Sequence, residues 1–123
     1  MEIRKTERYY AELDDDSLCT CDACRNYYKE IRAACPELAG YLSTMGIDIE
    51  KPFEAMPLDP EADGTILYLA VQYVVLGDRA DFAEADVAGV HIGLAESHPM
   101  TGLSEAHFVI ELSSVRLKWT MGK

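Results

Sequence analysis

The spacing of hydrophobic positions changes about halfway along the chain. In the first half, Cys24, Tyr28, Ile31 and Cys35 recur at steps of four, three and four, which places them on one face of a helix. Asp22 precedes this face and is the expected N-cap, because its carboxylate can accept the free amides of the first turn. A helix is therefore predicted to begin near residue 22 and to run to Cys35.

A second helix is predicted directly after the first. Pro36 disfavours helical geometry at Cys35, but it suits the first turn of a new helix, where a missing amide costs nothing. The inner face of this helix is lined by Leu38, Leu42 and Met45. Gly46 follows as a C-cap. Residues 19–46 are thus expected to form a helical pair.

The second half of the chain has the spacing of a sheet. Residues 66–76, ILYLAVQYVVL, are apolar on both alternating faces except for Gln72, as in a strand covered on both sides. Residues 78–87 read as an acidic connection. A short edge strand is predicted at 53–58, and strict alternation predicts further strands at 90–94, 108–112 and 115–119.

These elements predict one α+β domain over residues 1–123. Residues 1–18 are expected to be an extended arm or edge strand, with Tyr9, Tyr10 and Leu13 in its ordered part. The helical pair of residues 19–46 would pack on one face of a four- to five-stranded antiparallel sheet formed by residues 53–120.

Charge narrows the classes of partner. Acids outnumber bases 22 to 11, which gives a formal net charge of −11. Such a surface repels nucleic-acid phosphates and anionic lipids, so we expect no nucleic-acid or membrane partner and instead a protein partner, which could be a second copy in a homodimer. The sequence shows no secretory signal, and its longest apolar run is about half of the ~20 residues that span a membrane. A cytoplasmic location is therefore expected, where disulfides are unusual.

The candidate chemistry lies in CTCDAC, residues 19–24. Cys19, Cys21 and Cys24 have a ligand spacing usable for zinc, with a fourth ligand from elsewhere, for which His91, His98 and His107 are candidates. Cys35 lies eleven residues after Cys24, which is about 16 Å along a helix and too far to share one ion.

Two other interpretations of the cysteines stay open. Cys21 and Cys24 form a C-x-x-C at a helix start, which is typical of thiol oxidoreductases, although Asp22 beside them disfavours a thiolate. In the other interpretation no cofactor is bound, Cys24 and Cys35 are small buried side chains on the helix face, and Cys19 and Cys21 are reduced thiols.

A second candidate site would lie on the sheet. His91 and His107 both face away from the expected core. If residue 91 pairs with Val109, His107 lies diagonally across at about 7 Å. Glu111 would share that face, so the three side chains could bind a metal or move protons.

Three stretches of the chain resemble an uncharacterised family of small acidic, cysteine-containing proteins from gut Gram-positive anaerobes. The stretches are CDACRNYYKEI, PELAGYLSTMGIDIEKPFE and DGTILYLAVQYVVLG. The positions that fit the pattern are Cys21, Cys24, Arg25, Asn26, Gly46, Ile47, Asp48, Pro52, Glu54, Gly64, Tyr73, Gly77 and Trp119. The chain departs from it at Val74, where the family often has His, and at Lys118, where it often has Pro.

The resemblance implies no activity. The sequence contains no phosphate-binding glycine loop, nucleophile elbow or H-E-x-x-H motif. We therefore expect a non-enzymatic binding or interaction module, with a zinc-binding module and a thiol oxidoreductase as the alternatives.

Overall fold

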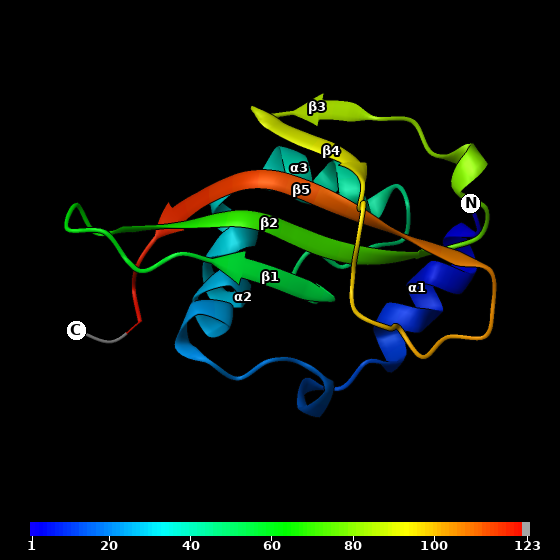
Figure 1. The fold of residues 1–123 in the computed structure, drawn as a ribbon, viewed down its shortest axis with the longest axis horizontal. Helices are drawn as coiled ribbons and strands as arrows, with labels where there is room; N and C mark the ends of the chain where they lie inside the picture. The colour runs from blue at the N-terminus through cyan, green and yellow to red at the C-terminus, as the bar shows by residue number, and fades with distance from the viewer. Residues whose placement is uncertain (122–123) are drawn as a thin grey trace.

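The computed structural model describes residues 1–121, except for the side chain of Asp15. The helices are α1 (Ile3–Glu12), α2 (Asp22–Ala34) and α3 (Pro36–Ser43), and the strands are β1 (Glu54–Pro57), β2 (Thr65–Leu76), β3 (Ala85–Val87), β4 (Val90–Leu94) and β5 (His107–Lys118). All neighbouring strands are antiparallel, in the order β1-β2-β5-β4-β3. Helices α2 and α3 lie behind the sheet in Figure 1, which confirms the predicted α+β class. None of the described helices is long and apolar enough to cross a bilayer.

The core lies between α2, α3 and the sheet. Tyr27 and Ile31 of α2 are fully buried, as are Tyr73 and Leu112 of the sheet. The hydroxyls of the two tyrosines are paired: Tyr27 and Tyr73 are linked at 2.7 Å, and Tyr73 donates to the carbonyl of Ile49 at 2.7 Å. Burial of these rings therefore leaves no hydroxyl unsatisfied, which is the condition for placing tyrosine in a core.

The prediction of an extended arm over residues 1–18 was wrong, because Ile3–Glu12 is helix α1. Thr6 and Tyr10 are its buried residues, four positions apart on one face. β1 pairs with β2 only as far as Gln72, and α1 supplies partners for the β2 backbone beyond that point. Thr6 Oγ1 accepts from the Leu76 N–H at 3.0 Å, and the Tyr10 hydroxyl donates to the Val74 carbonyl at 2.7 Å.

Two glycines permit the close approach of α1. Gly46 and Gly77 both have positive φ, at 85° and 114°. A Cβ on Gly46 would lie 2.5 Å from the carbonyl oxygen of Ile3, and one on Gly77 would lie 2.7 Å from the backbone nitrogen of Glu2. Any side chain at either position would therefore displace α1 as well as strain its own backbone.

The two strands predicted at 108–112 and 115–119 are one strand, β5. The alternation of buried residues breaks between Leu112 and Val115, and Ser114 there has a positive φ of 62°. Tyr68 and Val71 of β2 show the same break opposite, so the register continues from Tyr68–Val115 to Val71–Leu112. The predicted connection at 78–87 also contains a strand, the short edge strand β3.

Candidate metal centre

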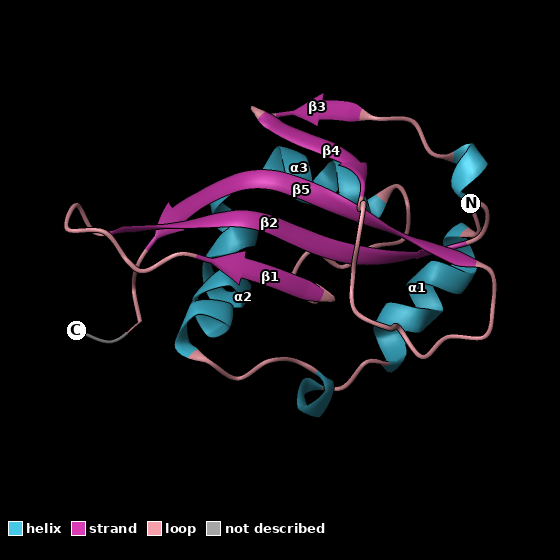
Figure 2. Cartoon of the chain, viewed as in Figure 1, coloured by secondary structure: helices cyan, strands magenta, loops and turns pink. Residues whose placement is uncertain are grey.

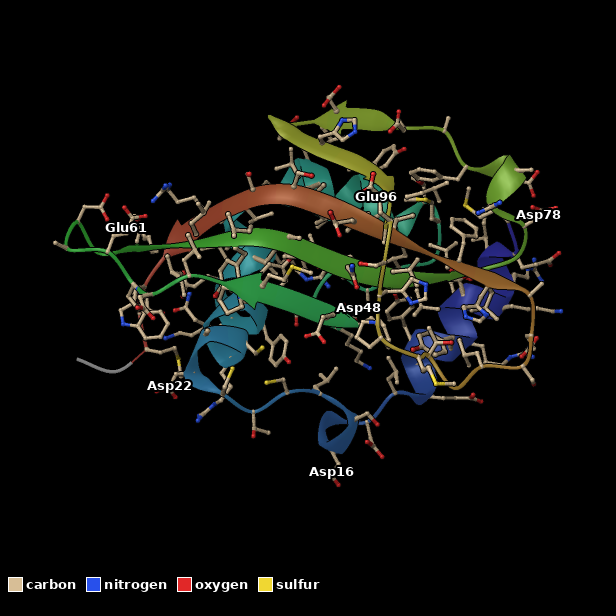
Figure 3. The ribbon with its side chains drawn as sticks, in the orientation of Figure 1. Asp16, Asp22, Asp48, Glu61, Asp78 and Glu96 are labelled. Carbon is tan, nitrogen blue, oxygen red and sulfur yellow. The ribbon has the colours of Figure 1, made fainter. Side chains whose placement is uncertain are left out.

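The cysteines lie in the segment that leads into α2, which we call the cysteine loop (residues 18–24). The N-cap of α2 is Cys21, one residue before the predicted Asp22. Its backbone is extended, with φ −67° and ψ 159°, and its Sγ accepts the N–H of Cys24 at 3.4 Å. Asp22, labelled in Figure 3, occupies the first turn, where its negative charge complements the helix dipole.

The three thiols of this loop form one cluster. The Sγ atoms of Cys19, Cys21 and Cys24 all lie within 4.8 Å of one another, and the distance from Cys19 Sγ to Cys21 Sγ is 3.4 Å. All three cysteines are free; Cys19 and Cys21 are exposed, whereas Cys24 is buried. Tetrahedral zinc with Zn–S bonds of about 2.3 Å requires sulfurs about 3.8 Å apart. The cluster therefore has nearly the separation that such an ion imposes.

Hydrogen bonds to the backbone hold the cysteine loop on both sides. The Tyr28 hydroxyl donates to the carbonyl of Cys19 at 2.8 Å, and the Tyr68 hydroxyl donates to the carbonyl of Ala23 at 2.5 Å. Because Tyr28 is on α2 and Tyr68 is on β2, the loop is tied both to its own helix and to the sheet. Supporting contacts of this kind orient ligands before an ion arrives.

The buried Asn26 ties the start of α2 to the end of the chain. Its side-chain amide donates to the carbonyl of Lys118 at 2.8 Å, and its Oδ1 accepts from the N–H of Thr120 at 2.8 Å. An amide has both a donor and an acceptor, so it can satisfy both backbone groups. Asn26 thereby fixes the first turn of α2 against the segment that follows β5.

The thiols differ in their electrostatics. Partial burial raises the pKa of Cys21, but hydrogen bonds from the Cys24 N–H and the Cys19 thiol outweigh it, and the net pKa lies below its ordinary value. Burial raises the pKa of Cys24, and the neighbouring thiols raise it further. A thiophilic cation among the three sulfurs would favour the thiolate at every position, because its charge outweighs that of neighbouring groups.

A surface hollow of about 320 Å³ adjoins the cluster and is lined by Leu18, Cys19, Thr20, Arg25 and Tyr28. Arg25 brings a positive charge to this hollow, where it can offset the negative charge of a site with three thiolates and one divalent ion. Among the described side chains, no further Cys, His, Asp or Glu ligand atom joins the cluster.

The other predicted site residues lie elsewhere. Cys35 is half-buried between α2 and α3, and burial raises its pKa. His91 contacts Asp86 at 3.0 Å and Glu84 at 3.5 Å, and His107 contacts Thr101 at 2.7 Å. Neither histidine joins the three cysteines as a fourth ligand.

The register on which a shared histidine site depended is not the one observed. His91 pairs with Ser113 rather than with Val109. His107 lies six residues before Ser113 on the same strand, which corresponds to roughly 20 Å. The two histidines therefore form no shared site with Glu111.

The hydrogen bonds by which Tyr28, Asn26 and Tyr68 support the cysteine loop were not predicted. The sequence held one signal for them, since a polar Asn26 follows Cys24 by two positions among residues expected to be helical. Its burial against Lys118 depends on the end of β5, which a helical pattern does not reveal.

Comparison with protein-family models, curated proteins and solved structures finds no match for the chain. The class of protein is therefore defined by its own features, an α+β domain with a three-thiol cluster at the start of its longest described helix. The resemblance to small acidic proteins of gut anaerobes stays a prediction.

Proposed function

We propose that this chain is a non-catalytic metal-binding module that holds one zinc ion through Cys19, Cys21 and Cys24. The observation that carries the proposal is the separation of the three Sγ atoms, all within 4.8 Å, in a loop that is already hydrogen-bonded in place. Thiolate sulfur is a preferred ligand of zinc, and C-x-C-x-x-C is a workable spacing for it. The fourth ligand in this proposal is water or a donor atom from outside the chain.

A bound ion would stabilise the cysteine loop, which hydrogen bonds from Tyr28 and Tyr68 position but which core packing holds only weakly. Cys19 and Cys21 are exposed, and their loop contributes few side chains to the core. An ion that binds the folded loop and not the unfolded chain stabilises the folded state by about 2.7 kcal/mol when free metal is 100 times the dissociation constant. The proposed role of zinc is thus to fix the cysteine loop and the adjoining surface.

The test is the zinc content and zinc affinity of protein purified under reducing conditions without chelator. We expect close to one zinc per chain. We also expect cobalt substitution to give thiolate-to-cobalt charge-transfer bands. Cys19→Ser, Cys21→Ser and Cys24→Ser should each weaken zinc binding roughly tenfold or more, because each removes a ligand. Cys35→Ser is the matched control and should bind zinc as the unmodified protein does.

Two results would contradict the metal-binding proposal. One is a zinc content below about a tenth of an ion per chain after exposure to excess zinc, since a structural site should be nearly filled. The other is an equal loss of affinity in Cys35→Ser and Cys21→Ser, which would indicate non-specific binding to thiols.

A second candidate function is thiol–disulfide exchange. It is favoured by the arrangement of the C-x-x-C pair, in which the exposed Cys21 caps the helix and the buried Cys24 lies behind it. In this reaction the Cys21 thiolate attacks a substrate disulfide and releases one thiol. Cys24 then attacks the mixed disulfide, releases the second thiol and leaves a Cys21–Cys24 disulfide.

Insulin reduction with dithiothreitol as the final reductant tests this candidate. Exchange predicts activity in the metal-free protein, loss of activity in Cys21→Ser, and a trapped mixed disulfide in Cys24→Ser. Activity no higher than that of dithiothreitol alone would eliminate it and would leave the metal-binding proposal unaffected.

A further inference from the structure

The two faces of the sheet are covered unequally. Helices α2 and α3 cover one face, and on the other face the loop that follows β4 passes in front of β5 and β2 (Figure 2). Under this loop, Val74, Leu76 and Val109 are buried against side chains that include Ala95 and Leu103. Among residues 1–121, no helix or loop lies over the rest of that face, which is formed by parts of β1, β2, β5 and β4 and which we call the open face (Figure 2).

Large apolar side chains are exposed on the open face. Met56 and Leu69 are 44% and 48% exposed, although each lies in a strand of the sheet. Leu69 is on β2 next to the position of Met56 on β1, between the pairs Ala55–Val71 and Pro57–Tyr68. Met56 also lines a hollow on this face. Apolar side chains gathered on one face in this way mark interaction surfaces more often than isolated ones do.

The same hollow is acidic. It encloses about 350 Å³, and besides Met56 it is lined by Glu84, Glu96, Glu111, His91 and Gly93 among others. Glu96 is labelled on the crossing loop in Figure 3. A Cβ on Gly93 would lie 3.2 Å from Glu84 Oε2 and 3.4 Å from His91 Nε2, so the absence of a side chain there keeps this part of the hollow open.

A side chain on the adjacent strand β2 holds Glu111 in position. The fully buried Gln72 pairs with it across the strands and donates to its Oε1 at 3.0 Å, and to the carbonyl of Ser97 at 2.9 Å. Among the described side chains, Gln72 Oε1 is a buried oxygen without a hydrogen-bond partner. A polar group buried next to residues that line a hollow is costly to the fold, which is a reason to look for a role in binding.

We infer that the open face is a docking surface for a basic amphipathic segment of a partner protein. A lysine or arginine of that segment would enter the acidic hollow, and its apolar side chains would pack on Met56 and Leu69. Charge selects this occupant: the net charge of −11 opposes close approach of a second copy, of nucleic acid and of anionic lipid, but favours a cationic protein segment. The hollow shares no lining residue with the cysteine loop, so this inference stands apart from metal binding.

The experiment uses the full chain and a synthetic eleven-residue peptide of alternating lysine and leucine, with a glutamate–leucine peptide as its charge-reversed control. Binding is measured by calorimetry and mapped by amide chemical shifts. We expect the lysine peptide alone to bind, with shifts concentrated on β1, β2 and β4. No variant is needed for this mapping, so it does not depend on the folding of a mutant.

Charge-matched variants separate the hollow from the overall negative charge. Glu96→Lys in the hollow and Glu37→Lys on α3, behind the sheet, change the net charge by the same amount. We expect Glu96→Lys to weaken peptide binding at least tenfold and Glu37→Lys to weaken it less than threefold. Leu69→Ser should weaken it several-fold, whereas Met100→Ser, on the loop, should not.

The inference is overturned if the two lysine variants weaken binding equally, if the shifts map outside the open face, or if the two peptides bind alike. It is also overturned if sedimentation shows a dimer of this chain whose interface maps, by amide shifts, to the open face, because a second copy would then occupy the face.

Discussion

Helix α2 begins and continues in two very different environments. Its body is packed into the core, where Tyr27 and Ile31 have no exposed surface. The cysteine loop, which leads into the helix, carries the exposed thiols of Cys19 and Cys21 and is held by hydrogen bonds from Tyr28 and Tyr68. The fold therefore positions the helix by burial and positions the proposed metal ligands by a small number of polar contacts.

The residues that stabilise the fold and the residues proposed to bind metal therefore lie in different parts of the same segment, the body of α2 and the cysteine loop. Burial of large apolar side chains contributes roughly 1.5–3 kcal/mol each, whereas a single hydrogen bond contributes a net of about 0.5–1.5 kcal/mol. Substitutions in the body of α2 should thus lower the stability of the fold without removing a metal ligand. Changes in the cysteine loop should alter metal binding and leave the fold largely intact.

The largest expected effect is that of Ile31→Ala in the body of the helix. Removing this fully buried side chain leaves a cavity against the sheet, and we expect the free energy of unfolding in urea to fall by about 2–5 kcal/mol. Ile3→Ala is the matched control, because Ile3 is 45% exposed on α1 and should lose less than about 1 kcal/mol. Equal losses in the two variants would mean that α2 does not depend on core packing.

Asn26 lies at the boundary between the two environments and should have the next largest effect. Asn26→Ala leaves the Lys118 carbonyl and the Thr120 N–H without their side-chain partner, at an expected cost of about 1–3 kcal/mol. Thr120→Ala keeps the backbone N–H and should cost less. If Asn26→Ala destabilises the protein by no more than Thr120→Ala in urea unfolding, the tie between α2 and the end of the chain has no energetic importance.

The body of α2 was predictable from the sequence because hydrophobic positions recur at helical spacing, from Cys24 through Tyr28 to Ile31, although the structure buries Tyr27 and leaves Tyr28 half-buried. The three thiols were also predictable as a group, since their spacing of two and three residues keeps them close in almost any backbone conformation. Both features depend only on local sequence.

What the sequence did not predict depends on contacts between distant segments. Helix α1 was missed because one of its buried positions is the polar Thr6, whose hydroxyl accepts from Leu76 seventy residues away. β5 was divided in two because the positive φ at Ser114 reverses the alternation without ending the strand. The pairing of His91 with Val109, on which a shared histidine site depended, does not occur, because register is set by the neighbouring strand and not by spacing within one strand.

The third and smaller expected effect on stability comes from the buried tyrosines of the core and depends on pH. Burial raises the pKa of Tyr27 and of Tyr73, and it raises that of Tyr68, near the cysteine loop, to about 12. Because the folded state holds these protons more tightly than the unfolded state, whose tyrosines titrate near pH 10, stability is complete below about pH 10 and falls as the pH rises above it.

The measurement is the free energy of unfolding in urea at several values between pH 8 and about pH 11. Tyr73→Phe should be less stable than the unmodified protein at pH 8 but should show a shallower fall above pH 10. The control is Tyr41→Phe, a half-buried tyrosine outside the hydrogen-bonded pair. An alkaline fall of the same slope in Tyr73→Phe and in Tyr41→Phe would contradict the assignment to the buried network.

The smallest effect on stability is expected from Cys21→Ser, and it gives the sharpest form of the comparison. Cys21 caps α2 through a weak sulfur acceptor at 3.4 Å, and serine is a better N-cap, so the metal-free variant should match or slightly exceed the unmodified protein in unfolding free energy. Cys21→Ala, which removes the cap, should cost about 0.5–1 kcal/mol in the absence of metal. With zinc added, the unmodified protein should gain more stability than either variant, because both variants lack a ligand. A loss of 2 kcal/mol or more in metal-free Cys21→Ser would show instead that the cysteine loop is as much a part of the folded core as Ile31.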